Sequence, residues 1–448
     1  MTFRPAHVYH ALSLLALTLI TWVIAATGET NLPPLLGSVR LATNLLYLNL
    51  AASYFLLLSD RYAGALPRVG WGLFAGIGLA LCAMHPVFSG DLMEYLIRGR
   101  ILGVYGLSPY AHVPAEFPND LLFGFCTWKQ NPDSYGPLFV LLETVPALVV
   151  PGSVFLSVWI EKAILLAFLC LGVFFFRRLA SGFADADRLA VAFAFCPLLV
   201  VATLVDGHND IVMLAFTLGA CHFFRTKRYS WAFIFITLGF LVKYTVLLIL
   251  PFLVAAAVKE KWGRGGKFPA GFIVRQIAMN AAVVVFAFAP FWAGQNTFLA
   301  LIRASGWFYT NTLPYALHQG LALSGFSVSE ATVKYGLLAA FGAVYTALLL
   351  RAWKTALSDD RIFFRTLCAA YLAFYVTITI PFGFHYLLWC LPWLVLSRWP
   401  FENLLVTLYS FAGLFSYFKR MNYLLILAAA AYFAALAFKR FYTQRRLA

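Results

Sequence analysis

Charged residues are scarce in this sequence. Only 11% of its 448 residues are Asp, Glu, Lys or Arg, and 62% are hydrophobic, whereas soluble domains are about 25% charged. The mean hydropathy is +0.82, and apolar stretches long enough to cross about 30 Å of hydrocarbon recur along the whole length. The composition excludes an ordinary soluble domain. It predicts an all-α, polytopic integral membrane protein with a single transmembrane domain over residues 1–448.

Motifs for metals, disulfides and nucleotides are also lacking. Of the seven cysteines, six fall in apolar runs and only Cys126 lies in a polar loop, so neither a disulfide framework nor a zinc-type spacing is present. The Gly-rich basic run at 259–267 lacks the spacing of a nucleotide-phosphate loop. We therefore expect no cofactor and no metal, although Asp206, His208 and Asp210 keep a metal conceivable.

The formal net charge of +15 could indicate a nucleic-acid partner, but its distribution does not. Basic residues cluster in alternate short loops, for example Arg177, Arg178, Lys259 and Lys261, and the loops between them hold far fewer. This positive-inside pattern predicts cytoplasmic termini and an outward-facing loop at 89–136. It indicates membrane lipids as partners and excludes nucleic acid. The start lacks a convincing cleavage site, so 8–26 is predicted to be a first span.

The apolar runs predict about 12–14 transmembrane helices. The segment 137–150 is too short for a full span and is predicted to be a partly inserted helix. A second outer loop is expected at 294–332. Spans are expected near 8–26, 40–58, 69–88, 154–176, 188–205, 209–224, 229–242, 244–258, 276–293, 333–351, 363–380, 384–397, 402–417 and 422–438.

The polar loop 89–136 interrupts these runs, and the stretch from Asp91 to Leu102 has helical spacing with Ser89 as its expected N-cap. Asp91 and Glu94 are three residues apart and would share one face of that helix. Burial beside the membrane raises the proton affinity of a carboxylate, which suits a general base. Alternatively, Asp91 only favours the helix N-terminus through the dipole. Arg98 and Arg100 could bind a phosphate or contact lipid headgroups.

Three further polar sites lie on the same predicted side. The sequence VDGHND, from Val205 to Asp210, is either a functional cluster or a turn that caps the next helix. Lys243 lies within an apolar stretch, where it either snorkels or faces an anionic phosphate. His385 sits at another outer turn, and isolated histidines are more often structural.

Taken in order, these motifs resemble those of the GT-C superfamily of membrane glycosyltransferases. The motifs are SGDLMEYLIRGRIL, GVYGLSPY, SYGPLFVLLETVPAL, VDGHND, LVKYTVLLILP and FHYLLWCLPW. Together they are most similar to the bacterial polyprenol-phosphate-mannose-dependent mannosyltransferases, over roughly residues 70–395. Two expected spans before Asp91 and the lack of a terminal soluble domain depart from many relatives.

The resemblance implies an EC 2.4 transferase in the bacterial inner membrane with a periplasmic active site. By that resemblance the enzyme would move a hexose, with mannose as the first candidate, from a polyprenyl-phosphate sugar to a glycolipid, glycan or protein acceptor with inversion. Other sugars remain open. Asp91 would be the catalytic base in the outer catalytic loop 89–136. The expected substrate-binding residues are Glu94, Tyr95, Arg98, Arg100, Tyr135, Asp206, His208, Asn209, Asp210, Lys243, Tyr244 and His385.

Two other classes of protein fit parts of the pattern. A transporter or lipid flippase would also carry many spans and buried charges, but it usually places its ligands at the midplane of the membrane. An acyl or phospho-group transferase would use His208 and Asp210. The gathering of ionisable residues at one face favours the glycosyltransferase.

Overall fold

The structure is a computed structural model that describes residues 5–26, 36–59, 68–84, 86, 89–310, 312–355, 359–398 and 402–415. Across these ranges the chain is helical and contains no β-strand, which confirms the predicted all-α class. Three stretches are long and apolar enough to cross a membrane, and a bent pair, Ala186–Ala194 with Pro197–Val205, makes a possible fourth. These stretches are Val154–Ala180, Ala270–Phe291 and Glu330–Lys354. The higher count of 12–14 stays a prediction, and the span expected near 422–438 lies outside the described residues.

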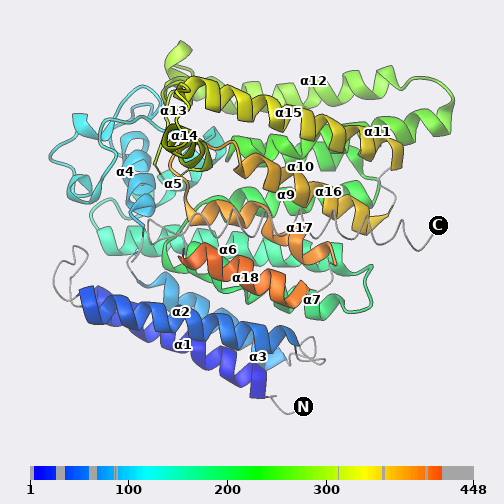
Figure 1. Cartoon of the computed structure of the whole chain (residues 1–448). Coiled ribbons are helices and arrows are strands. Elements are labelled where there is room, and N and C mark those ends of the chain that lie inside the picture. Colours follow the sequence, from blue (N-terminus) through cyan, green and yellow to red (C-terminus); the bar gives the residue numbers. More distant parts are fainter. Residues whose placement is uncertain are drawn as a thin grey trace.

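The long helices run side by side in layers (Figure 1). One outer layer holds α1 (Pro5–Ala26), α2 (Leu36–Ser59) and α3 (Arg68–Cys82). The opposite outer layer holds α11 (Leu250–Gly265), α12 (Ala270–Phe288) and α15 (Glu330–Thr355). Between them lie α6 (Val154–Ala180), α7 (Ala186–Ala194), α8 (Pro197–Val200), α9 (Asp210–Arg225), α10 (Tyr229–Phe240), α16 (Asp360–Tyr375), α17 (Leu391–Leu396) and α18 (Glu402–Phe415).

The helices of both expected outer loops lie at one end of the layers. In 89–136, α4 (Asp91–Gly103) covers the predicted surface helix and is followed by the 3-10 turns Pro114–Glu116 and Phe123–Phe125. The segment 294–332 is not an extended loop, because it folds into the 3-10 turn Gly294–Phe298, α13 (Leu299–Ser305) and α14 (Leu313–Leu323). The expected inserted piece is α5 (Pro137–Val149), and its depth in the membrane stays a prediction.

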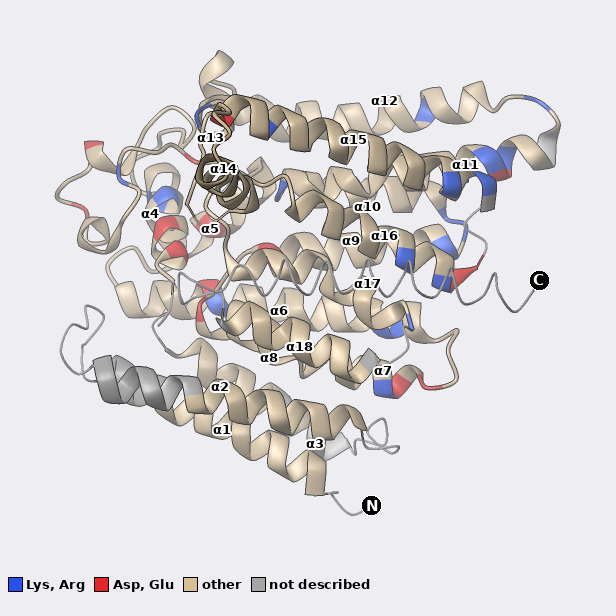
Figure 2. Ribbon diagram, in the orientation of Figure 1, with Lys and Arg blue, Asp and Glu red and all other residues tan. Residues whose placement is uncertain are grey.

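Charge is distributed unevenly between the two ends of the layers (Figure 2). Lys and Arg gather at the end where α11 finishes and α16 begins, whereas several Asp and Glu surround α4 and α5 at the other end. This is the arrangement that the positive-inside rule requires, with the polar loops opposite the basic end. Orientation in a membrane stays a prediction.

Several expected spans lose regular α-helical geometry where they approach α4. The predicted span 188–205 is broken into α7, α8 and the π-helical turn Val201–Val205, with a 45° bend between its two halves. The spans expected to begin at 244 and 384 open with the 3-10 segments Tyr244–Leu248 and Phe384–Trp389. Non-helical backbone at membrane depth is tolerated where it is buried in protein or lines a cavity. These breaks place VDGHND, Lys243 and His385 around one space.

A close crossing of α4 and α5 fixes the base of the polar end. A Cβ atom on Gly99 would stand 1.8 Å from the carbonyl oxygen of Glu143, so only glycine permits the approach. Gly103 repeats the contact one turn later against Ala147 and Thr144. Small residues four apart on α4 thus hold α5 against it, and the orientation of the Asp91 end follows from that packing.

Candidate active site

A cavity of about 520 Å³ lies between α4, α13 and the segments that begin at Lys243 and Pro381. Asp91 borders it from the first turn of α4, with its side chain 31% exposed. The N-cap of α4 is Gly90 and not the expected Ser89. Ser89 Oγ nevertheless accepts a hydrogen bond from the backbone amide of Asp91 at 3.3 Å. The cavity opens directly onto the carboxylate that the sequence singled out.

Glu94 also borders the cavity, but its carboxylate is engaged with the loop. It accepts hydrogen bonds from the amide of Trp128 at 2.9 Å and the thiol of Cys126 at 3.0 Å, and it pairs with Arg98 at 3.1 Å. Asp91 and Glu94 share the first turn of α4 and have different surroundings. Glu94 anchors residues 126–128, and Asp91 faces open space.

Arg98 and Arg100 are buried and paired within the loop. Arg100 Nε donates to Asp120 Oδ2 at 2.7 Å and does not border the cavity. Arg98 does border it, yet besides Glu94 it donates to the carbonyl of Asn131 at 3.3 Å. Both guanidinium groups are buried and paired with carboxylates, so neither is placed to bind a phosphate or to contact lipid headgroups.

The VDGHND segment lies behind the cavity, where its side chains contact two residues that border it, Asp91 and Lys243. Asn209 occupies the N-cap position of α9 but makes no capping bond, so the alternative of a simple side-chain cap does not describe it. Gly207 has a positive φ of 76°, which lets the chain turn between Asp206 and His208. Asp206 is fully buried behind this turn and lies outside the cavity wall.

Lys243 points into the cavity, where Asp210 and aromatic rings surround its ammonium group. Its Nζ donates to Asp210 Oδ1 at 2.8 Å, and the side chain is only 12% exposed. The ammonium lies 5.1 Å from the ring centre of Tyr386, 5.4 Å from that of Trp389 and 5.5 Å from that of Tyr135. Trp389 Nε1 also donates to Asp210. Such a caged cation is held in place and does not snorkel to the surface.

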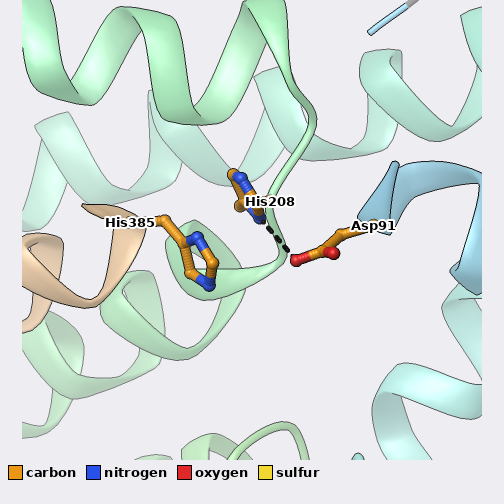
Figure 3. Close-up of side chains that lie close together, drawn as sticks. All are labelled: Asp91, His208 and His385. Atoms are coloured by element: carbon orange, nitrogen blue, oxygen red, sulfur yellow. Dashed lines mark ion pairs between the residues drawn. The ribbon is translucent and has the colours of Figure 1, made fainter. Parts of the chain in front are cut away.

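Asp91, His208 and His385 come together from three separate segments (Figure 3). His208 Nδ1 lies 3.3 Å from Asp91 Oδ2, and the His208 and His385 rings stack with centroids 3.7 Å apart. His385 Nε2 lies 4.0 Å from Asp210 Oδ2, which links this trio to Lys243. Apart from the ion pair of His208 with Asp91, both ring nitrogens of His208 and Nδ1 of His385 make no hydrogen bond within the described chain.

The same trio is close enough to be considered as a metal site, because one ligand atom from each residue lies within 4.8 Å of the others. The two imidazole planes, however, are only 20° apart. Imidazole lone pairs lie in the ring plane, so nearly parallel stacked rings cannot both aim at one ion about 2.1 Å away. In this arrangement the two imidazoles and the carboxylate do not point at a common position for a metal ion.

The surroundings of Asp91 determine its ionisation. Burial disfavours the carboxylate, as the sequence led us to expect, but the imidazole of His208 and the more distant His385 and Lys243 outweigh it. Together they hold the pKa of Asp91 well below its usual range, so the expectation of a raised proton affinity is wrong. Asp91 is therefore ionised and able to accept a proton, with a weakened driving force.

The first part of the sequence is similar to known proteins. Residues 38–259 match the family model of the alpha-(1->6)-mannopyranosyltransferase N-terminal domain. Alpha-(1->6)-mannopyranosyltransferase A of Mycobacterium tuberculosis is 30% identical over 206 residues, 46% of this chain and 40% of that protein. The protein of the same name from Corynebacterium glutamicum is 25% identical over 38% of this chain and 35% of its own length. Over this region the chain is similar to the alpha-(1->6)-mannopyranosyltransferases.

The resemblance to membrane mannosyltransferases of the GT-C type is thereby confirmed. A probable alpha-(1->6)-mannopyranosyltransferase of Mycolicibacterium smegmatis is 25% identical over 50% of this chain and 44% of its own length. The chain thus spans less than half the length of each of these relatives. The region matched to the mannopyranosyltransferase family model includes Asp91, VDGHND and Lys243, whereas His385 and α13 lie beyond it.

Sequence reasoning missed several polar groups of this chain. Glu143, Glu161 and Lys162 are fully buried, and the pair at 161–162 interrupts the apolar run of the expected span 154–176. A cation within that run was the available signal, because intramembrane charges are usually functional. Trp389 was also missed, although it lies in the same motif as His385. Tyr95, Tyr135 and Tyr244, which were expected at the site, all border the cavity.

Proposed function

We propose that this protein transfers a hexose, in the first place mannose, from a polyprenyl-phosphate sugar to a glycan or lipid-linked acceptor on the outer face of the membrane. The observation that carries the proposal is one cavity bordered by both an ionised carboxylate, Asp91, and a caged cation, Lys243. Inverting sugar transfer from a phosphate needs both groups: a base for the acceptor and a positive charge for the leaving group.

The chemistry balances with these two groups. The acceptor hydroxyl gives its proton to a carboxylate oxygen of Asp91 while its oxygen forms a bond to the anomeric carbon. The bond from that carbon to the phosphate oxygen breaks, and its electron pair leaves with polyprenyl phosphate. Lys243 lies where it would stabilise the charge that develops on this oxygen, and Asp210 keeps the ammonium in place.

The remaining walls of the cavity suit the other parts of a lipid-linked donor. Tyr386 and Trp389 stack with ring centres 4.6 Å apart and present flat faces beside Lys243. Ile380, Pro381 and Leu301 form an apolar side, which fits the start of a polyprenyl chain. His385 borders the same cavity and would contribute a hydrogen bond to the phosphate.

The test is an assay of purified full-length protein in nanodiscs with a panel of polyprenyl-phosphate sugars and native-membrane lipids as acceptors. Asp91→Asn should abolish transfer and leave donor binding unchanged, because the base is lost and the shape is kept. Glu116→Gln, an exposed carboxylate of the same loop that lies away from the cavity, is the matched control and should transfer normally. Transfer by Asp91→Asn at the wild-type rate would overturn the assignment of the base, and movement of a labelled lipid across sealed vesicles without donor consumption would establish the flippase.

A further inference from the structure

Lys162 is a fully buried cation that the proposed reaction does not use. It lies in α6, and its ammonium group donates to the carbonyl oxygens of Met84 at 2.6 Å, Val205 at 2.8 Å and Leu81 at 3.4 Å. An ammonium has three N–H donors, so each has an acceptor. The carboxylate of Asp206 adds a favourable electrostatic interaction.

The three acceptors belong to the ends of two different helical segments. Leu81 lies in the last turn of α3, and Met84 follows that helix. Val205 is the last residue of the π-helical turn Val201–Val205. Carbonyl groups at helix C-termini lack intrahelical partners and carry partial negative charge. One ammonium therefore caps both segments and ties them to α6.

Both capped segments lead directly to the reacting groups. Asp91 follows Met84 by seven positions, and His208 follows Val205 by three. A second contact joins the two segments, since a Cβ on Gly207 would lie 2.9 Å from Leu92 Cδ1. The 3.3 Å approach of His208 to Asp91 is thus supported on one side by packing and on the other by Lys162.

We propose that Lys162 is a positioning residue, which holds the Asp91 and VDGHND segments in register so that His208 meets the catalytic carboxylate. Its importance for catalysis rests on the function proposed above, but its effect on the two segments does not. A buried cation on a third helix is suited to this task because its carbonyl contacts are directional and its side chain cannot move to water.

Hydrogen exchange of the full-length protein in nanodiscs tests, without any substrate, whether Lys162 holds the two segments together. Lys162→Met removes all three donors and nearly keeps the volume, whereas Lys162→Gln keeps two donors on a shorter, neutral side chain. In Lys162→Met, exchange should rise at least tenfold at residues 83–91 and 205–209 together, and remain within threefold elsewhere in α6 and α9. Lys162→Gln should give a smaller rise at the same places, and it takes over as the test if Lys162→Met does not fold.

Glu161→Gln is the matched control, because Glu161 is the buried neighbour on the same helix and its carboxylate oxygens have no hydrogen-bond partner within the described chain. It should exchange as wild type. Unchanged exchange at 83–91 and 205–209 in both Lys162 variants would overturn the proposal. So would a uniform rise over the whole bundle, which is the result for a residue that only stabilises the fold.

Activity then tests the catalytic part. Lys162→Met should lower kcat per folded protein about tenfold to a hundredfold with donor KM within threefold, since misplacement by about 1 Å costs rate on that scale. The combination with His208→Asn should lose little more than the larger single change, because both act through the same contact. Additive losses would overturn the positioning role. If the wild-type protein is inactive with every donor, only the proposed sugar transfer is overturned. Hydrogen exchange would still decide whether Lys162 holds the two segments.

Discussion

The loop around Arg100 and the floor of the cavity around Lys243 both hold a cation beside a carboxylate, but they differ in surroundings. Arg100 and Asp120 are enclosed, and Tyr105 and the amide of Leu122 supply further bonds to Asp120. Lys243 borders a cavity, and Oδ2 of its buried partner Asp210 has no hydrogen-bond partner in the described chain. Complete pairing indicates a structural role, whereas incomplete pairing beside open space indicates a site for a ligand.

The largest expected effect is on the reacting carboxylate. Asp91→Asn should reduce kcat about a hundredfold to ten-thousandfold, because general-base catalysis contributes roughly 10²–10⁴ and the amide cannot accept the proton. Single-turnover transfer from a radiolabelled donor measures this loss. An Asp91→Asn enzyme with kcat within tenfold of wild type would show that Asp91 is not the base.

The enclosed pair should affect stability and leave chemistry unchanged. Arg100→Met leaves a buried carboxylate without its cation, which should lower the free energy of unfolding by about 3–5 kcal/mol. Activity per folded protein should stay within threefold, since Arg100 does not border the cavity. Thermal unfolding in nanodiscs gives the first quantity, and Arg177→Met, which breaks the exposed pair with Asp187, is the control expected to change it by no more than about 1 kcal/mol.

The cavity cation, in contrast, should affect binding of the donor. Lys243→Met should weaken donor binding about tenfold to a hundredfold, the value of one charge-assisted hydrogen bond to phosphate. Asp210 is as fully buried as Asp120, so Lys243→Met should also lower the free energy of unfolding, and donor binding is measured per folded protein. Lys129→Met, which removes a cation of the outer loop that does not border the cavity, should bind the donor normally. Equal donor affinity in Lys243→Met and wild type would place the phosphate elsewhere.

The smallest expected effect is a shift in pH dependence. His208 helps to hold the pKa of Asp91 below its usual range, so wild-type kcat/KM should have no acid limb above about pH 4. In His208→Asn the pKa rises, Asp91 binds a proton at higher pH, and the acid limb should move upward by about one pH unit or more. An unmoved limb in the pH profile would separate His208 from the base.

Sequence reasoning anticipated much of this arrangement. A helix from Asp91 to Leu102 is predicted because polar residues at helical spacing follow an apolar run, and α4 (Asp91–Gly103) confirms that helix, whose first residue, Asp91, borders the cavity. The separate motifs around His208, Lys243 and His385 were each recognisable by a polar side chain in an apolar setting, and the structure brings them together. The sequence places Arg98 and Arg100 on the same helix as Asp91. It does not indicate that Arg98 pairs with Glu94 and Arg100 with Asp120.

The sequence by itself determined that this is an all-α membrane protein with a resemblance to mannosyltransferases of the GT-C type, because apolar run length and ordered motifs are local properties of the chain. Tertiary structure alone decided which ionisable side chains have complete partners. Those partners, such as Asp120 for Arg100 and the carbonyls of Met84 and Val205 for Lys162, lie on other segments and are set by packing. The same packing lowers the pKa of Asp91, since the responsible imidazole comes from a segment more than a hundred residues away in the sequence.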